Sequence, residues 1–232
     1  MPANTTFIIF IVALVLASMI LLILVFYVLR LIKLSTKLRA KQFTKFNATA
    51  YKNQIVFLGD SLTDFYQVEE FFHNYKIYNR GIASDTTKGV LDRLDTNVIQ
   101  IKPRKVFLQI GTNDYLFHNN EYIYNNIIKI VEKIKTGVED VKVYIISLYP
   151  VNHRKKIYSR FFTTLRRNKS IILLNEKLKD YCLNNNLPFI DVHNHLIDEK
   201  GNLDKKYSVE GLHISYEGYE VITDILLPYV KD

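Results

Sequence analysis

A serine at a turn of the chain is the first candidate for chemistry in this sequence. Ser61 lies in the run GDSLTD (residues 59–64), directly after a short apolar segment. A serine at a strand-to-helix turn can direct its hydroxyl out of a sheet and use its own N–H to stabilise negative charge. The same spacing also fits a capping box formed by Ser61 and Asp64. Because residue 63 is Thr, the run is not a G-x-S-x-G elbow, which disfavours the α/β-hydrolase fold.

A histidine near the C-terminus is the candidate base for this serine. His213 ends the run VEGLH (residues 209–213), which places Glu210 three residues before it. A carboxylate at that spacing can turn back onto Nδ1 of the imidazole and leave Nε2 to accept the serine proton. Ser61, His213 and Glu210 are therefore the candidates for nucleophilic catalysis.

Two further runs can supply hydrogen-bond donors to a developing oxyanion. Gly81 lies in NRGIAS (residues 79–84) and Asn113 lies in GTND (residues 111–114). An oxyanion hole needs donors that already point at the oxygen that gains charge. The Gly81 N–H and the Asn113 carboxamide are of the right type, provided that the fold brings them to Ser61.

Alternating strands and helices are predicted to position these runs. Short β-rich segments predict strands at residues 55–58, 76–79, 105–110, 141–148 and 188–192. Helical patterns lie at residues 63–72, 86–94, 121–135, 159–184 and 216–230. This order predicts a doubly wound α/β fold with a five-stranded parallel sheet. In such sheets the active site lies beyond the C-terminal ends of the strands, where the first three runs would meet.

The four runs, in this order, resemble the SGNH (GDSL-type) family of serine esterases and lipases. The resemblance covers residues 53–230, and the run RGIASDTTKGVL (residues 80–91) is similar to platelet-activating-factor acetylhydrolases and to lysophospholipase- and acetylesterase-like proteins. It implies a flavodoxin-like three-layer α/β/α arrangement, and a reaction that needs no metal and no cofactor.

The resemblance also implies a role for each matching residue. Ser61 would attack an ester carbonyl, and His213 would act as general base and then as general acid. The Ser61 N–H, the Gly81 N–H and the Asn113 side chain would form the oxyanion hole. The family usually has Asp three residues before the histidine, whereas this chain has Glu210. We expect Glu210 to orient the histidine, with Asp204 and Asp198 as the alternatives.

A long apolar run near the N-terminus predicts a membrane anchor. Phe7 to Leu29 are 23 residues without a charge, a proline or a glycine. As a helix they would span about 34 Å, enough to cross a hydrocarbon core of about 30 Å. A cleaved signal peptide is disfavoured, because no Lys or Arg precedes the run and the run is longer than a signal h-region. The predicted organisation is an anchor at 1–30, a basic juxtamembrane linker at 31–52 and a hydrolase domain at 53–232.

The net charge of +8 belongs mostly to the N-terminal segment. Residues 1–50 contain six basic side chains and no acidic one, whereas the other 182 residues contain 25 basic and 23 acidic ones. A nearly neutral body argues against a nucleic-acid partner. The cations follow the apolar run and could contact anionic headgroups. The positive-inside rule then predicts a cytoplasmic catalytic domain, with an extracellular one as the alternative.

These features predict a membrane-anchored serine esterase that works through an acyl-serine intermediate. Its substrate would be an acyl lipid such as a lysophospholipid, or an O-acetylated glycan. Two alternatives stay open: acyl transfer to another alcohol by the same residues, and a catalytically weak binding or scaffold protein of the same fold.

Overall fold

The computed structural model describes residues 3–153 and 159–232, which contain a five-stranded parallel sheet. The strands are β1 (Ile55–Gly59), β2 (Ile77–Gly81), β3 (Lys105–Gln109), β4 (Lys142–Ile146) and β5 (Phe189–Ile190). Their order in the sheet is β2-β1-β3-β4-β5, and every neighbouring pair is parallel. The prediction of a doubly wound, flavodoxin-like sheet is confirmed. Its direction of winding reverses at β1, which places a ligand site at the ends of β1 and β3.

Alternate strand residues face two separate hydrophobic clusters. On β1, Val56 and Leu58 belong to one cluster, whereas Ile55 and Phe57 belong to the other. Side chains alternate between the faces of a strand, so a parallel sheet covered on both sides needs apolar residues at every position. All five β1 residues are buried accordingly.

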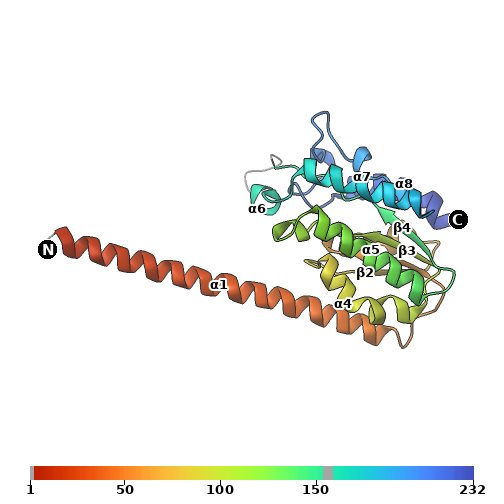
Figure 1. Ribbon diagram of the computed structural model, residues 1–232, viewed down its shortest axis with the longest axis horizontal. Helices are drawn as coiled ribbons and strands as arrows, with labels where there is room; N and C mark the ends of the chain where they lie inside the picture. The colour runs from red at the N-terminus through yellow and green to blue at the C-terminus, as the bar shows by residue number, and fades with distance from the viewer. Residues whose placement is uncertain (1–2, 154–158) are drawn as a thin grey trace. The chain divides into compact units, whose positions relative to one another are not determined.

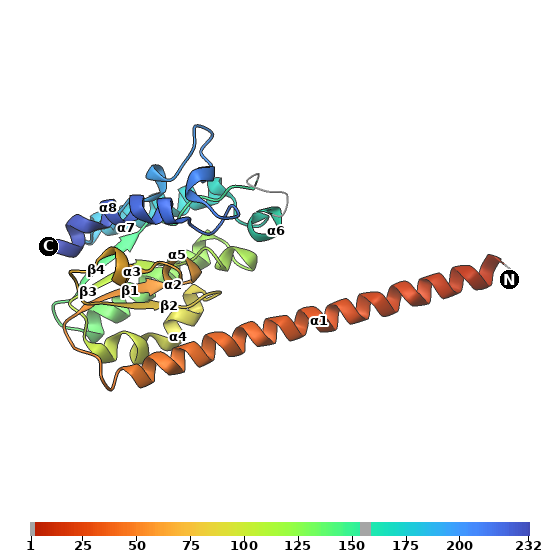
Figure 2. The same ribbon diagram turned by 180° about the vertical axis from the view of Figure 1, so that it is seen from behind.

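Helices cover both faces of the sheet. The Val56 cluster includes residues of α4 (Thr87–Asn97), α5 (Asn120–Gly137) and α7 (Asn168–Asn184). The Phe57 cluster includes residues of α3 (Val68–Phe71) and α8 (Tyr216–Lys231). Figure 1 shows α4 and α5 on the near face, and Figure 2 shows α2 (Ser61–Asp64) and α3 on the opposite one. Short 3₁₀ turns lie at Ile99–Ile101, Asp114–Leu116, His193–His195 and Lys205–Tyr207.

The helix predicted at residues 63–72 is wrong as a single element. The structure has a one-turn helix, α2 (Ser61–Asp64), and then α3. Between them, the Asn79 side chain donates hydrogen bonds to the carbonyl oxygens of Thr63 (2.8 Å) and Tyr66 (2.9 Å). The Thr63 carbonyl also accepts a hydrogen bond from the Tyr66 N–H (3.1 Å), which closes a tight turn at this point. The helix therefore ends after one turn, and the Asn79 side chain ties the chain after Ser61 to β2.

The helix predicted at residues 159–184 is also divided in two. It consists of α6 (Ser159–Thr163) and α7, with a break before Asn168. The Asn168 side chain accepts a hydrogen bond from the Val151 N–H (2.8 Å) and donates one to the Val151 carbonyl (2.9 Å). This contact with the loop after β4 fixes the start of α7, and it lets the residues just before it turn toward the sheet edge.

The N-terminal residues form one long helix, α1 (Ala3–Phe46), which contains the candidate membrane span. The chain divides into two units, residues 1–39 and 40–232. The end of α1 therefore belongs to the larger unit, although the sequence analysis assigned it to a linker. Phe43 is only 3% exposed, and the Asn97 side chain donates to the Ala40 carbonyl (3.0 Å) and the Thr44 hydroxyl (3.1 Å).

These contacts predict that the larger unit needs residues 40–47 for full stability. A fragment of residues 48–232 should have a free energy of unfolding at least about 3 kcal/mol lower than that of residues 36–232. It lacks one buried aromatic side chain and the hydrogen bonds that Ala40, Thr44 and Asn47 make with the rest of the larger unit. Urea unfolding measures the difference. Phe43→Ala in the longer fragment should reproduce most of it, and Leu38→Ala should not. Equal stability of the two fragments would contradict the prediction.

Candidate active site

Ser61, His213 and Glu210 form a continuous hydrogen-bonded chain. The Nε2 atom of His213 lies 3.1 Å from Oγ of Ser61, and its Nδ1 atom lies 2.6 Å from Oε1 of Glu210. The same Glu210 oxygen accepts a hydrogen bond from the His213 backbone N–H at 3.1 Å. Ser61 is the first residue of α2, two residues after the end of β1, and the other two residues come from the loop before α8. The fold thus brings together three residues that the sequence analysis selected from two distant runs.

The loop that carries Glu210 and His213 is fixed by its own backbone. Gly211 has a φ of +106°, a conformation that favours glycine, and a Cβ at this position would lie 2.2 Å from the Asn152 carbonyl oxygen. The Gly211 carbonyl accepts a hydrogen bond from the Asn152 N–H, and the Gly211 N–H donates one to Oγ of Ser208, each at 2.7 Å. This tight turn lets the carboxylate reach the imidazole three residues later.

The two alternative carboxylates have other partners. Oδ1 of Asp198 accepts hydrogen bonds from the backbone N–H groups of Lys200 and Asn202. Asp204 caps a 3₁₀ turn by accepting a hydrogen bond from the Lys206 N–H. Among the residues that the structure describes, Glu210 is therefore the carboxylate that contacts His213.

The environment of Glu210 keeps its carboxylate charged. Burial alone would raise the pKa of Glu210, but the hydrogen bonds from His213 and its charge outweigh burial and lower that pKa. An ionised Glu210 accepts from Nδ1–H and stabilises the imidazolium that forms when His213 takes a proton. The longer side chain that replaces the usual Asp is accommodated without losing this contact.

Asp60, and not Ser61, caps the helix that begins at the serine. Its Oδ1 accepts a hydrogen bond from the Leu62 N–H at 2.9 Å, so the capping-box interpretation of Ser61 is wrong. In the described part of the chain, the Ser61 N–H has no hydrogen-bond partner. It stays available at the N-terminal end of α2, beside the serine hydroxyl.

Gly81 is placed at the site, but its N–H is already used. It donates to Oδ1 of Asn79 at 2.8 Å, so it could serve an oxyanion only by sharing or giving up this bond. A Cβ on Gly81 would lie 2.2 Å from the Asp64 nitrogen. The absence of a side chain therefore lets the end of β2 pack directly against α2.

Asn113 is held at both ends of its carboxamide. Its Nδ2 donates to the Asp85 carbonyl and its Oδ1 accepts from Nη2 of Arg166, each at 2.9 Å. Nε of Arg166 donates to the Thr112 carbonyl at 3.0 Å, and the Arg166 residue is 5% exposed. An amide nitrogen has two donors, so this arrangement leaves the second Nδ2–H of Asn113 for an oxyanion.

A second buried arginine ties the strand ends together. Arg93 donates to the carbonyls of Gly59 (3.2 Å) and Arg80 (2.9 Å), and its Nε forms an ion pair with Asp85 at 2.8 Å. Neither arginine was predicted from the sequence to lie at the site. Arg93 offered a weak signal, because it lies in a predicted helix beside the apolar Leu94 and three residues after Val90. Arg166 offered none, because its partners are more than 50 residues away.

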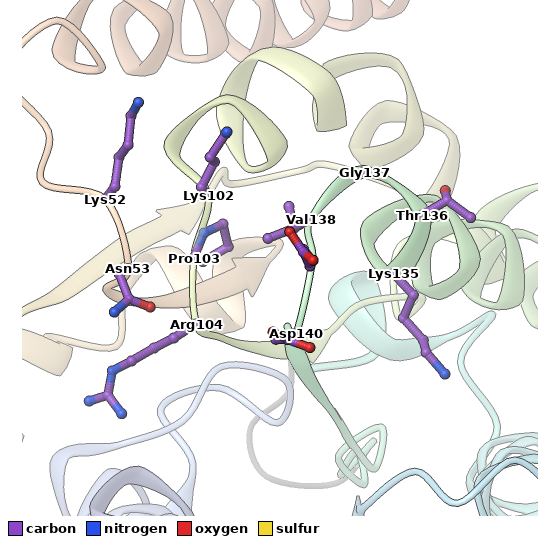
Figure 3. Close-up of a pocket in the computed structure, with 11 residues that line it drawn as sticks. Lys52, Asn53, Lys102, Pro103, Arg104, Lys135, Thr136, Gly137, Val138 and Asp140 are labelled. Atoms are coloured by element: carbon purple, nitrogen blue, oxygen red, sulfur yellow. The ribbon is translucent and has the colours of Figure 1, made fainter.

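Elsewhere in the described residues, a cavity and the possible metal ligands were considered as further candidate sites. A cavity of about 750 Å³ lies before β1, β3 and β4, at the sheet edge opposite Ser61. Figure 3 shows lysine, arginine and acidic side chains around it, with no serine or histidine among its lining residues. Within the described ranges, no group of three or more His, Cys, Asp or Glu side chains is arranged to hold a metal ion.

Comparison with known proteins identifies the family. Residues 57–221 match the sequence profile of the GDSL-like Lipase/Acylhydrolase family. The chain belongs to this family. The resemblance to SGNH hydrolases is confirmed.

Two curated relatives show how far the similarity extends. The N-acylneuraminate cytidylyltransferase of Escherichia coli O18:K1:H7 is 28% identical over 182 residues, which cover 77% of this chain and 41% of that protein. The chain thus spans about two fifths of the length of that relative. Platelet-activating factor acetylhydrolase IB subunit alpha2 of Rattus norvegicus is 27% identical over 177 residues, 72% of each chain.

Solved structures have the same fold. A structure from Streptococcus pneumonia, described as that of a candidate platelet activating factor, has a TM-score of 0.81 at 26% identity and covers 92% of this chain and 99% of that one. A GDSL-like lipase from Bacteroides thetaiotaomicron has a TM-score of 0.73 at 24% identity, covering 83% and 97%. The second likeness shows the fold alone.

The position of Arg166 predicts a loss of turnover when the arginine is removed. In Arg166→Met, Asn113 loses the contact that aims its amide, so kcat on p-nitrophenyl acetate should fall about 10²-fold with little change in KM. Arg166→Lys should recover part of the loss. The exposed neighbour provides the control, Arg167→Met, which should retain full activity. Unchanged kcat in Arg166→Met would contradict this role.

The burial of Asp60 predicts a pH-dependent stability. Burial is the main cause that raises the pKa of Asp60 from 3.8 to about 7. Between about pH 4 and 7 the folded state holds a proton on Asp60 that the unfolded state has released. The free energy of unfolding therefore falls as the pH rises through this range. Asp60→Asn lacks this titration but keeps an acceptor for Leu62. Its stability relative to the wild type should rise over that range, by about 4 kcal/mol at most.

Urea unfolding of residues 36–232 at several pH values measures this difference. Asp180→Asn, at an exposed position on α7, is the control and should show no comparable trend. A difference between Asp60→Asn and the wild type that is independent of pH would contradict the prediction.

Proposed function

We propose that this chain is a membrane-anchored serine esterase that hydrolyses carboxylic esters through an acyl-Ser61 intermediate. The observation that carries the proposal is the continuous contact from Ser61 Oγ through His213 to Glu210. Membership in an acylhydrolase family supports the same chemistry.

In the acylation step, Oγ of Ser61 attacks the ester carbonyl while Nε2 of His213 takes the hydroxyl proton. The negative charge that forms on the carbonyl oxygen is stabilised by the Ser61 N–H and the second Nδ2–H of Asn113. Gly81 adds its N–H where the bond to Asn79 is shared. His213 then gives its proton to the departing alcohol oxygen, and the acyl group stays on Ser61.

In the deacylation step, water takes the place of the alcohol. Nε2 of His213 removes a proton from the attacking water, and the same donors stabilise the second oxyanion. Collapse of this intermediate releases the carboxylic acid and returns the proton to Ser61. Glu210 remains ionised throughout and holds the imidazole in the orientation that both steps need.

The candidate membrane span in α1 supports attachment to a bilayer. We infer that residues 1–30 form the anchor and that the basic residues after it contact anionic headgroups. The charge bias favours a cytoplasmic catalytic domain, and an extracellular one is the alternative.

The substrate is either an acyl lipid, such as a lysophospholipid, or an O-acetylated glycan. The acetylhydrolase relative favours a short acyl group.

Acyl transfer to another alcohol would use the same residues, and the products distinguish it from hydrolysis. The interpretation as a catalytically weak scaffold rested on Glu210 in place of Asp. The 2.6 Å contact between Glu210 and His213 argues against it.

Hydrolysis of p-nitrophenyl esters from acetyl to palmitoyl by the full chain in detergent tests the proposal. Ser61→Ala should lower kcat by about 10³-fold or more, because no nucleophile remains. Ser170→Ala, on α7, is the matched control and should retain activity. A maximum at acetyl would favour O-acetyl substrates, and one at long chains would favour lipids. Full activity in Ser61→Ala would overturn the proposal.

A further inference from the structure

Exposed apolar side chains lie on the chain segments that carry the candidate active site. We call them the apolar rim; they are Phe65, Leu116, Phe117, Leu165, Val209 and Tyr216. Each lies within four residues of Ser61, Asn113, Arg166, Glu210 or His213 in the sequence. Phe117 is 74% exposed and Tyr216 is 65% exposed. The rim therefore lies on the chain segments that carry the candidate site residues.

One part of the rim borders the histidine. The Phe65 ring lies 5.2 Å from the His213 ring, centroid to centroid, and Tyr216 lies 5.5 Å from Phe71. With Val209, these aromatic residues line a cavity of about 430 Å³ that has His213 in its wall. An apolar group bound there would lie directly beside the base.

The other part of the rim borders the oxyanion donors. Leu116 ends the 3₁₀ turn that follows Asn113, and Phe117 comes directly after it. Leu165 precedes Arg166, whose guanidinium binds the Asn113 side chain. The two parts of the rim thus approach the reacting groups from the sides of His213 and Asn113.

Six exposed apolar side chains on the segments of one site need an explanation, because single exposed apolar residues are ordinary whereas a group of them marks an interaction surface. The candidate membrane span in the same chain points to the partner. A few inserted side chains bind a bilayer weakly on their own. A tether to that bilayer makes the contact intramolecular and raises the effective concentration of lipid.

We propose that the apolar rim inserts into the surface of the lipid bilayer that anchors the chain, so that esters reach Ser61 from the lipid phase. Phenylalanine, leucine and tyrosine are suited to the boundary between headgroups and acyl chains. The inference rests on the membrane anchor of the proposed function, and it holds for either side of the membrane.

The chain contains no tryptophan, so a single introduced tryptophan reports its own surroundings. The experiment uses full-length Phe117→Trp and Tyr216→Trp, each reconstituted into phosphatidylcholine vesicles. A third variant, Leu183→Trp, is the control, because Leu183 is 78% exposed and lies near the end of α7, outside the rim. Fluorescence is compared between ordinary lipid and lipid brominated near the top of one acyl chain.

Insertion of the rim predicts that bromolipid lowers the fluorescence of Phe117→Trp and Tyr216→Trp by about half or more, because their side chains reach the acyl boundary. Leu183→Trp should be unaffected. Any other pattern overturns the inference, including quenching of all three variants or of only one rim position. Because the readout does not depend on catalysis, an inactive protein with a quenched rim would count against the esterase proposal alone.

Discussion

The buried Arg93 guanidinium is the interaction on which the arrangement of the site depends. It binds the Gly59 carbonyl two residues before Ser61, and the Arg80 carbonyl directly before Gly81. Its ion pair with Asp85 fixes the residue whose carbonyl receives the Asn113 amide. Arg93 thus connects the ends of β1 and β2 directly, and Asp85 links it to Asn113 in the segment after β3. Burying this ion pair costs desolvation free energy, and removing one partner would leave an uncompensated buried charge. Loss of either Arg93 or Asp85 should therefore destabilise the folded unit strongly.

The parallel sheet and this arginine supply the serine and the oxyanion donors, and the base comes from elsewhere in the chain. His213 and Glu210 lie in a loop whose turn at Gly211 is held against Asn152, in the loop after β4. The nucleophile and the base are 152 residues apart in the sequence, so the tertiary fold is what brings them together. The catalytic geometry therefore depends on correct folding of the larger unit.

The features that depend on local sequence patterns, namely the strands and the motif residues, could be predicted from the sequence. Alternating apolar segments predicted the five strands, and short motifs predicted Ser61, His213 and Glu210. The side chains that end or divide elements could not be predicted, because Asn79 and Asn168 act through carbonyls and loops distant in sequence. Arg166 could not be predicted for the same reason, because its partners Thr112 and Asn113 are distant in sequence. The engaged Gly81 N–H depends on a neighbouring rotamer that no motif encodes.

The central claim is that His213, oriented by Glu210, makes Ser61 the reactive nucleophile. A fluorophosphonate probe, followed by intact mass and peptide mapping of the full chain, tests it most directly. The account predicts one adduct per chain, located on Ser61, and labelling slower by about tenfold or more in His213→Ala and Glu210→Gln. Labelling of another residue, or equal rates in the wild type and both variants, would contradict it.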